Sequence, residues 1–517
     1  MLRVNDIKIN VRNKDQHESI KHHLYNLFKQ SIDDFIIIKK SIDARNKKSN
    51  GVYFVYEVLV NLPANERFLK INNVSVYTKE EYQLPTIERD LKNRPIIIGF
   101  GPAGLFCSYI LAKVGLKPII FERGKKIEER IKDVEEFWNN NKLNINSNIQ
   151  FGEGGAGTFS DGKLNTNIKG SLRQKFILET FVEFGAPKEI LYINKPHIGT
   201  DILRKVIINM RNKIIDLGGT INYESALTDI IVKDNKLKSI IINNKDEYET
   251  ETLVLAIGHS ARDTFKMLNN NLTMEPKAFA VGVRVQHKQI DINKNQYGLD
   301  HRFLPPADYK LTYQTKDGRG VYSFCICPGG FVVNSSSEEN RLCINGMSNH
   351  ERNEENANSA IVVTVSPKDF GSNIFDGMKF QQDLENKAFS EGKRLIPVSL
   401  YKDYKLNQIS TSFGTIKPIF KGGYNFANIN NIFPDYINNS LKEGIDYFSS
   451  KIDGFNNDDV IIAAVEARTS SPVRILRDDN LESNIKGIYP CGEGAGYAGG
   501  ITSAAIDGIK VAEKIIK

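Results

Sequence analysis

Three glycines and one acid between residues 95 and 122 have the types and spacing needed to hold an adenosine diphosphate. The glycines follow an apolar run at residues 95–98 in a G-x-G-x-x-G pattern, at Gly99, Gly101 and Gly104. The first glycine allows a tight turn, the second lets backbone approach a pyrophosphate, and the third lets a helix pack closely on a sheet. The phosphates would then lie at the helix N-terminus, where the free backbone N–H groups and the positive end of the helix dipole face them.

An acid after the next apolar segment completes this pattern. Glu122 follows residues 118–121, about 20 residues beyond the glycines, where a carboxylate accepts hydrogen bonds from ribose hydroxyls and repels a 2′-phosphate. A lone G-x-G-x-x-G can also be a turn without a ligand, but strand, helix, second strand and acid in this order favour dinucleotide binding. The expected contacts are Gly99, Gly101, Pro102, Ala103, Gly104, Glu122 and Arg123.

A second glycine-rich segment lies near the C-terminus. A short strand at residues 485–489, a glycine turn at 491–500 and a helix at 502–516 are expected there. The helix would direct its positive end toward the N1 and O2 atoms of a flavin, and Glu493 would bind a ribityl hydroxyl. Taken alone, the segment is equally well explained as a connection that packs on the first helix. Together with the first motif it predicts contacts at Gly492, Glu493, Gly499, Gly500 and Ile501.

A third glycine-rich segment, residues 151–166, reads FGEGGAGTFSDGKLNT. Successive glycine amides can form an anion-binding nest. Lys163 would neutralise a phosphate or polarise the pyrimidine edge of a flavin. The alternative is a mobile surface loop without a ligand. The expected contacts are Gly154, Gly155, Gly157, Thr158, Ser160 and Lys163, joined by Gly258 at the end of a strand at residues 252–257.

The elements that must position these motifs predict an α/β fold. Residues 92–273 and 454–517 form the two parts of a Rossmann-like domain with a parallel sheet and a β-meander at residues 220–248. Residues 274–453 are expected to be an inserted substrate or cap domain on a mixed sheet, with strands at 278–286, 321–326, 331–334, 341–344 and 360–365. Residues 1–85 form a small α+β module, and a linker follows it.

Composition limits the protein class. A chain of 517 residues is too long to fold around one hydrophobic core, so we expect several domains. A hydrophobic content of 40% with 25% charged residues is ordinary for a soluble protein. We expect no membrane span and no signal peptide, hence a cytoplasmic protein. Five scattered cysteines indicate a reducing compartment, and Cys325 and Cys327 form only a C-x-C pair. No metal site is predicted.

The three glycine-rich segments together resemble a bacterial family of FAD-dependent dehydrogenases, the NAD(FAD)-utilising proteins. The segments at residues 323–365 and 465–478 are similar to further blocks of that family, and the resemblance covers nearly the whole chain. It implies a fold related to the glutathione-reductase type, with FAD as cofactor. It implies no particular substrate.

No second G-x-G-x-x-G lies between a predicted strand and helix with a trailing acid after a further strand. NAD(P)H would therefore visit the flavin transiently, or a small-molecule substrate would itself reduce the flavin. Arg284 and His287 on one strand face opposite ways by alternation, and arginines near a flavin commonly hold carboxylates. The substrate candidates are Arg284, His287, Arg468 and Arg474, although each taken singly is more often a surface or salt-bridge residue.

The function expected from these motifs is an FAD-dependent oxidoreductase that transfers a hydride between a small organic substrate or NAD(P)H and the flavin. One alternative is a flavoprotein that binds or modifies RNA through its N-terminal module, because the net charge is +7 and Lys39, Lys40, Arg45, Lys47 and Lys48 form a basic run. Another is an NAD-dependent dehydrogenase without flavin, which would leave the C-terminal motif unused. The sequence does not indicate an oligomeric state.

Overall fold

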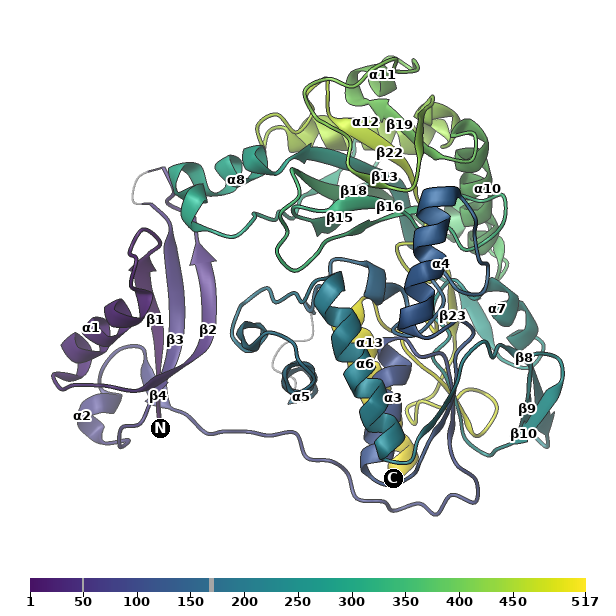
Figure 1. The fold of residues 1–517 in the computed structure, drawn as a ribbon, viewed down its shortest axis with the longest axis horizontal. Helices are drawn as coiled ribbons and strands as arrows, with labels where there is room; N and C mark the ends of the chain where they lie inside the picture. Colours follow the sequence, from purple (N-terminus) through teal and green to yellow (C-terminus); the bar gives the residue numbers. More distant parts are fainter. Residues whose placement is uncertain (49–50, 167–171) are drawn as a thin grey trace.

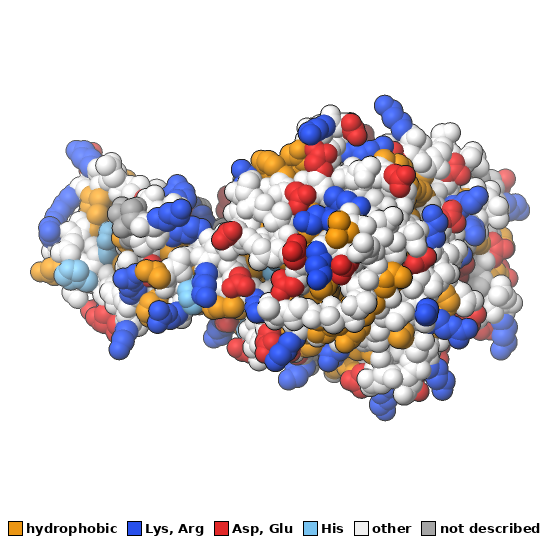
Figure 2. All heavy atoms as spheres, turned by 90° about the horizontal axis from the view of Figure 1, so that it is seen from above, with side chains coloured by type: hydrophobic (Ala, Val, Ile, Leu, Met, Phe, Trp, Pro, Cys, Tyr) orange, Lys and Arg blue, Asp and Glu red, His pale blue; other side chains and the backbone are white. Residues whose placement is uncertain are grey.

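The computed structural model describes residues 1–48, 51–166 and 172–517. Its N-terminal module is a lobe that a narrow neck joins to the larger body (Figure 2). Four antiparallel strands in the order β2-β3-β1-β4 form its sheet. The elements are β1 (Leu2–Asn10), α1 (Gln16–Phe28), β2 (Phe35–Asp43), β3 (Tyr53–Val60), α2 (Glu66–Leu69) and β4 (Val74–Val76).

An extended linker runs from this lobe to a five-stranded parallel sheet (Figure 1). The strand order is β24-β11-β5-β6-β7, so strands from both ends of the chain lie beside one another. The central strands are fully apolar and buried, as expected of a parallel sheet covered on both faces. The strands are β5 (Ile96–Ile98), β6 (Ile119–Phe121), β7 (Thr220–Asn222), β11 (Leu253–Leu255) and β24 (Ile488–Pro490).

Helices cover one face of this sheet and a β-meander covers the other. On the helical face, α3 packs closely along α13, with α5 and α6 beside them (Figure 1). The meander is β8 (Leu227–Lys233), β9 (Lys236–Ile242) and β10 (Asp246–Glu249), and β7 belongs to the parallel sheet instead. The helices are α3 (Pro102–Lys113), α5 (Leu172–Glu183), α6 (Thr200–Asp216) and α13 (Ile501–Ile516).

The inserted region is built on a seven-stranded sheet in the order β14-β15-β18-β13-β22-β19-β21. It holds the largest apolar core, against which α10 (Asp376–Glu391) and α12 (Asp435–Phe448) pack. A small sheet of β16, β17 and β20 lies beside it. The strands are β13 (Phe279–Lys288), β14 (Thr312–Gln314), β15 (Gly320–Cys327), β16 (Phe331–Asn334), β17 (Ile344–Met347), β18 (Asn356–Val365), β19 (Ile396–Leu400), β20 (Phe420–Lys421), β21 (Tyr424–Phe426) and β22 (Ile461–Glu466).

Two expectations about the inserted region differ from the structure. The strand β22 was expected in the C-terminal part of the nucleotide domain, but it pairs with β13 and β19, so the insertion continues beyond residue 453. The strand expected at residues 341–344 is found at Ile344–Met347, because Leu342 and Cys343 are buried in a connection and only the later residues pair with β16. The remaining predicted strands of the insertion overlap observed strands.

The N-terminal module contacts both other parts of the chain. The Lys40 amide donates to the Tyr192 carbonyl at 2.7 Å, and the Asn194 amide donates to the Lys40 carbonyl at 2.9 Å. On the inserted region, Asp300 accepts from the Arg12 guanidinium at 2.6 Å and from the Val52 amide at 2.9 Å. These backbone and carboxylate contacts fix the lobe against the body although the linker is long.

The basic run of this module is engaged within the protein. Lys39 forms an ion pair with Glu57, and Arg45 forms one with Asp43. The Lys40 ammonium lies 4.1 Å from the centre of the Phe54 ring. The Lys47 ammonium donates to the Asn295 carbonyl. Four of the five basic side chains therefore contact other protein groups and do not form a free cationic track.

The described parts of the chain contain no helix that could span a membrane. Within residues 1–48, 51–166 and 172–517, each helix is too short or too polar to cross a bilayer.

Candidate functional site

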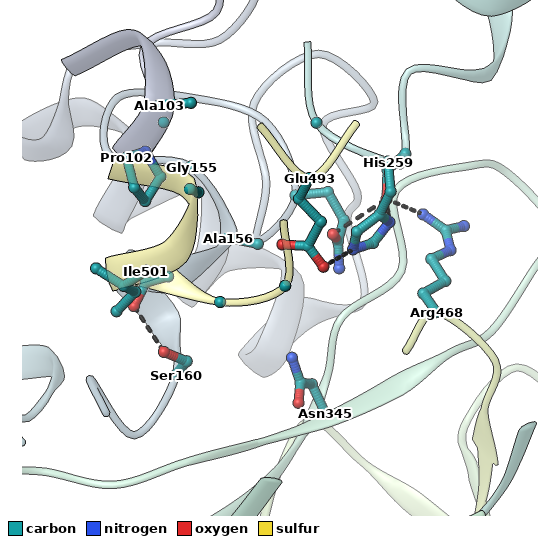
Figure 3. Close-up of a pocket in the computed structure, with 18 of the residues that line it drawn as sticks. Pro102, Ala103, Gly155, Ala156, Ser160, His259, Asn345, Arg468, Glu493 and Ile501 are labelled. Carbon is teal, nitrogen blue, oxygen red and sulfur yellow. Dashed lines mark hydrogen bonds and ion pairs between the residues drawn. The ribbon is translucent and has the colours of Figure 1, made fainter. Parts of the chain in front are cut away.

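A cavity of about 510 Å³ lies where the carboxyl ends of the parallel strands face the inserted region. The residues directly after β5, β6, β11 and β24 all line it, which is where open α/β sheets bind their ligands. Figure 3 shows Pro102, Gly155 and Ile501 on one side of this space and His259 and Arg468 on the other. The volume suits a cofactor-sized ligand.

The fingerprint turn has the backbone geometry that its glycines predict. Gly99 has a φ of +92°, and a Cβ there would lie 2.3 Å from the Ala256 carbonyl oxygen. A Cβ on Gly104 would lie 2.0 Å from the Gly99 carbonyl oxygen, so this glycine lets α3 approach the turn. Gly101 is the N-cap of α3, and it faces Gly155 with 3.6 Å between its Cβ position and the Gly155 Cα. Two glycines thus let two loops meet at the helix N-terminus.

The Glu122 carboxylate is buried and holds backbone amides. Its Oε2 accepts from the Phe100 amide at 2.8 Å, and its Oε1 accepts from the amides of Gly124 and Gly152, both at 2.9 Å. An ionised carboxylate offers about four acceptor positions, so one position on Oε2 remains for a ribose hydroxyl. The acid therefore joins the fingerprint turn to the glycine-rich loop and also faces the cavity.

The glycine-rich loop is built around the side chain of Arg130, which the sequence analysis missed. Arg130 lies on α4 (Ile127–Asn140) and is completely buried. Its guanidinium also lies 4.9 Å from the centre of the Phe159 ring. Burial lowers the pKa of Arg130 to about 9. The guanidinium donates to five carbonyl oxygens at 2.6–3.2 Å, those of Asn148, Ile149, Gly152, Glu153 and Gly155.

The C-terminal glycine turn reaches the same cavity. Gly500 is the N-cap of α13 with a φ of +95°, and a Cβ at Gly499 or Gly500 would meet no atom within 4 Å. The turn is held from behind by Asp507, whose carboxylate accepts from the Gly492 amide at 2.7 Å and from the Arg477 guanidinium. The N-termini of α3 and α13 therefore both open onto one space.

Glu493 and His259 form a polar part of the cavity wall near the N-terminus of α13. The His259 Nε2 and Glu493 Oε1 atoms lie 4.0 Å apart (Figure 3). Burial raises the pKa of Glu493 to about 7, opposed by its hydrogen bond with the Gly500 backbone and by Lys277. Burial, together with the charges of Arg468 and Arg262, lowers the pKa of His259 to about 3. His259 is therefore neutral at physiological pH, and Glu493 titrates near it.

A buried ion network supports this wall. The Glu385 carboxylate accepts from both Arg262 and Arg468 at 2.8–2.9 Å. These two guanidinium groups hold the pKa of Glu385 well below its usual range although burial opposes them. Arg468 also donates to Ser260 and Ser337, and it lines the cavity. The network joins α10 of the inserted region to the loop after β11.

Most of the predicted cofactor residues line this cavity, and four lie behind its wall. Gly104 and Gly154 permit close packing, since a Cβ on Gly154 would lie 2.2 Å from the Thr158 Oγ1. Thr158 is buried beneath the loop, and Gly492 abuts Ala103. The predicted residues that line the cavity are Gly99, Gly101, Pro102, Ala103, Glu122, Arg123, Gly155, Gly157, Ser160, Lys163, Gly258, Glu493, Gly499, Gly500 and Ile501.

Of the four substrate candidates, only Arg468 lines the cavity. Arg284 is fully buried behind it, where its guanidinium donates to Glu466, Asn345 and Asn358. His287 lies in the core of the inserted region and its Nε2 is 2.9 Å from the Phe455 carbonyl oxygen. Arg474 pairs with Glu275 outside the cavity. Arg284 consequently acts on the site through the residues that it holds.

Two parts of the chain match known domain families. Residues 278–469 match the family described as FAD-dependent protein, C-terminal domain-like. Residues 1–61 match a domain of unknown function, DUF8436. An uncharacterised protein of Clostridium beijerinckii is 49% identical over 505 residues, which are 95% of this chain and 94% of that protein.

Several solved structures are similar at low identity, and two of the three described next are in complex with FAD. CtdE in complex with FAD is 12% identical with a TM-score of 0.32, covering 81% of this chain and 86% of that one. The halogenase PltM is 10% identical with a TM-score of 0.36, covering 82% and 68%. Glycerol-3-phosphate dehydrogenase from Bacillus halodurans complexed with FAD is 9% identical with a TM-score of 0.35, covering 83% and 65%.

The cofactor of this protein is FAD. The residues present fit it, because the cavity joins a dinucleotide fingerprint with an acid to a second helix N-terminus, and open space faces Gly258, Gly499 and Gly500. The alternative of a dehydrogenase that works without flavin is therefore wrong. The resemblance to FAD-dependent proteins is confirmed at the level of the domain at residues 278–469.

Proposed function

This chain belongs to the same family as the uncharacterised Clostridium beijerinckii protein, and from that premise we propose that it is an FAD-dependent oxidoreductase. In this proposal a hydride passes between a small organic substrate or NAD(P)H and the flavin. One observation carries the proposal: the N-terminal fingerprint and the C-terminal turn line a single cavity, with Gly101 and Gly500 both on its wall. A dinucleotide site alone would not need the second helix N-terminus.

Bound FAD would supply a two-electron acceptor and donor, and the protein would bind and orient it. The N-terminus of α3 would hold the pyrophosphate, and Glu122 would hold the ribose. The N-terminus of α13 would face the part of the flavin where negative charge gathers on reduction. Glu493, with its pKa raised to about 7, is placed to exchange a proton near neutral pH.

A spectroscopic test identifies the reductant of the flavin. The sequence has one dinucleotide fingerprint, so the proposal includes NAD(P)H only as a transient visitor. Anaerobic stopped-flow spectroscopy with NADH, NADPH and a panel of amines and hydroxy acids would follow the flavin absorbance near 450 nm. The expected result is bleaching by one donor. A purified protein that is colourless and takes up no FAD would refute the proposal.

A further inference from the structure

The cavity extends past the N-terminus of α13 to the inserted sheet, and this far end has a distinct chemistry. Its wall is formed by β15, β17 and the segments that carry Lys163, Lys195 and residues 308–310. We propose that it is the substrate subsite and that it takes a small organic carboxylate. This inference rests on the proposed function and names its substrate class.

Carboxylates at this end are already engaged. The Asp308 carboxylate pairs with Lys195 at 2.8 Å, and the Glu466 carboxylate pairs with Arg284 at 2.7 Å. Asp161 forms an ion pair with Arg352. Each of these three carboxylates is thus matched by a cation, which reduces its repulsion of an anion.

Two lysines lie on the same wall. The Lys163 ammonium donates to the Ile326 carbonyl, which carries no net charge. Lys310 is exposed at the cavity wall. Among the residues that the structure describes, neither ammonium group forms an ion pair with a carboxylate. The far end therefore carries two unmatched positive charges beside the space where a substrate would lie.

Asn345 adds a hydrogen-bond donor that points into the cavity. Its Oδ1 accepts from the Arg284 guanidinium at 3.0 Å and from the Gly346 amide at 2.8 Å. The oxygen is therefore fixed away from the space, and the Nδ2 end faces it, as Figure 3 shows. Arg284 is in this way a positioning residue for Asn345.

The thiol of Cys325 adds no negative charge to this end of the cavity. Its side chain is exposed to the cavity from the bulge in β15. Burial within the surrounding protein raises the pKa of the thiol to about 12, so it is neutral at physiological pH. The groups free to meet a ligand at this end are thus cations and donors, which is the complement of a carboxylate.

The test uses the FAD-loaded protein and pairs of carboxylates with their neutral amides: benzoate with benzamide, and succinate with succinamide. Binding is followed by perturbation of the flavin spectrum and, independently of turnover, by the shift in thermal unfolding. We expect carboxylates to bind at least tenfold more tightly than the amides, and their affinity to fall with rising salt. Equal affinity for carboxylate and amide would overturn the inference.

The variants are Lys163→Met, Lys310→Met and Asn345→Asp, with Lys266→Met as the control because Lys266 is an exposed lysine outside the cavity. Each of the first three should weaken carboxylate binding about tenfold, which corresponds to about 1.4 kcal/mol. Should Lys163→Met fail to hold FAD, Lys310→Met carries the test, since its side chain is exposed. An unchanged carboxylate affinity in Lys310→Met would refute the subsite. Absence of FAD from the wild-type protein would refute the proposed function instead.

Discussion

The Glu122 carboxylate accepts a hydrogen bond from the Gly152 amide at 2.9 Å, so the acid after β6 holds the glycine-rich loop in place. The sequence pattern assigns this acid to a ribose. The structure adds three backbone amides, and Glu122 therefore organises the turn after β5 and the loop before η1 (Ala156–Phe159) at once. Loss of the charge at this position should consequently affect cofactor binding in two ways.

Replacement of Glu122 by Gln should release FAD. The side-chain amide nitrogen would face a backbone N–H, and charge-assisted hydrogen bonds of this kind are worth roughly 1.5–3 kcal/mol each. We expect FAD affinity to fall about 10- to 100-fold, measured from the ratio of 450 nm to 280 nm absorbance after gel filtration. Glu249→Gln, an exposed acid on β10, is the matched control. Equal FAD retention in the two variants would contradict this role.

Replacement of Arg130 by Lys should destabilise the glycine-rich loop. An ammonium has three donors, so at least two of the five carbonyls would lose their partner, at roughly 1–3 kcal/mol for each buried group. We expect weaker FAD binding and a lower unfolding midpoint in urea. Arg204→Lys is the control, because Arg204 also lies over the Phe159 ring, at 4.4 Å, but is only partly buried. Equal effects of the two substitutions would show that the carbonyl contacts are unimportant.

The nucleotide strands and the turn at Gly99 were predictable because their signals are local. Apolar runs, glycines and an acid at fixed spacing need no knowledge of the rest of the chain. The helix α12 was missed although Ile437, Leu441 and Ile445 recur at helical spacing and are buried. The periodic signal for a helix is therefore present in the sequence, but the inserted region is predicted mainly as strands.

The remaining features depend on contacts between distant segments. The apolar run of β22 has the same composition wherever it pairs, and only its pairing with β13 and β19 places it in the inserted sheet. Arg130 lies at helical spacing with Ile127 and Val134 on the buried face of α4, but the sequence does not indicate its acceptors because they are backbone carbonyls. Arg284 was predicted near a substrate, but Glu466 and Asn345 use its donors.

The N-terminal module should not bind RNA. Its basic run is paired with Glu57 and Asp43 or lies against protein groups, and phosphate binding would have to break these contacts. We expect no retardation of a tRNA in gel-shift experiments, even at about 50 mM salt where such binding is strongest. A shift that weakens with added salt, and that is lost on substitution of Lys39 and Lys48 by Glu, would restore the RNA alternative.

The stability of the FAD-free protein should fall as pH rises from about 4.5 to about 7 because of Glu493. The pKa of this carboxyl is 4.5 in the reference state and about 7 in the fold, where burial disfavours its charge. Between these two pKa values the folded state holds a proton that the unfolded chain releases. The resulting stabilisation is fully present below pH 4.5 and is lost progressively as pH rises to about 7. The effect has an upper limit of about 3 kcal/mol.

Urea unfolding of the wild type and of Glu493→Gln between pH 4.5 and 8.5 measures this loss. The side chain is 27% exposed, so part of the effect is screened by solvent. The glutamine of Glu493→Gln cannot ionise. The free energy of unfolding of the variant, relative to that of the wild type, should therefore rise with increasing pH from 4.5 and stay constant above pH 8. Glu249→Gln should follow the wild type at every pH. A difference between wild type and Glu493→Gln that does not change with pH would show that burial does not disfavour the charge of Glu493.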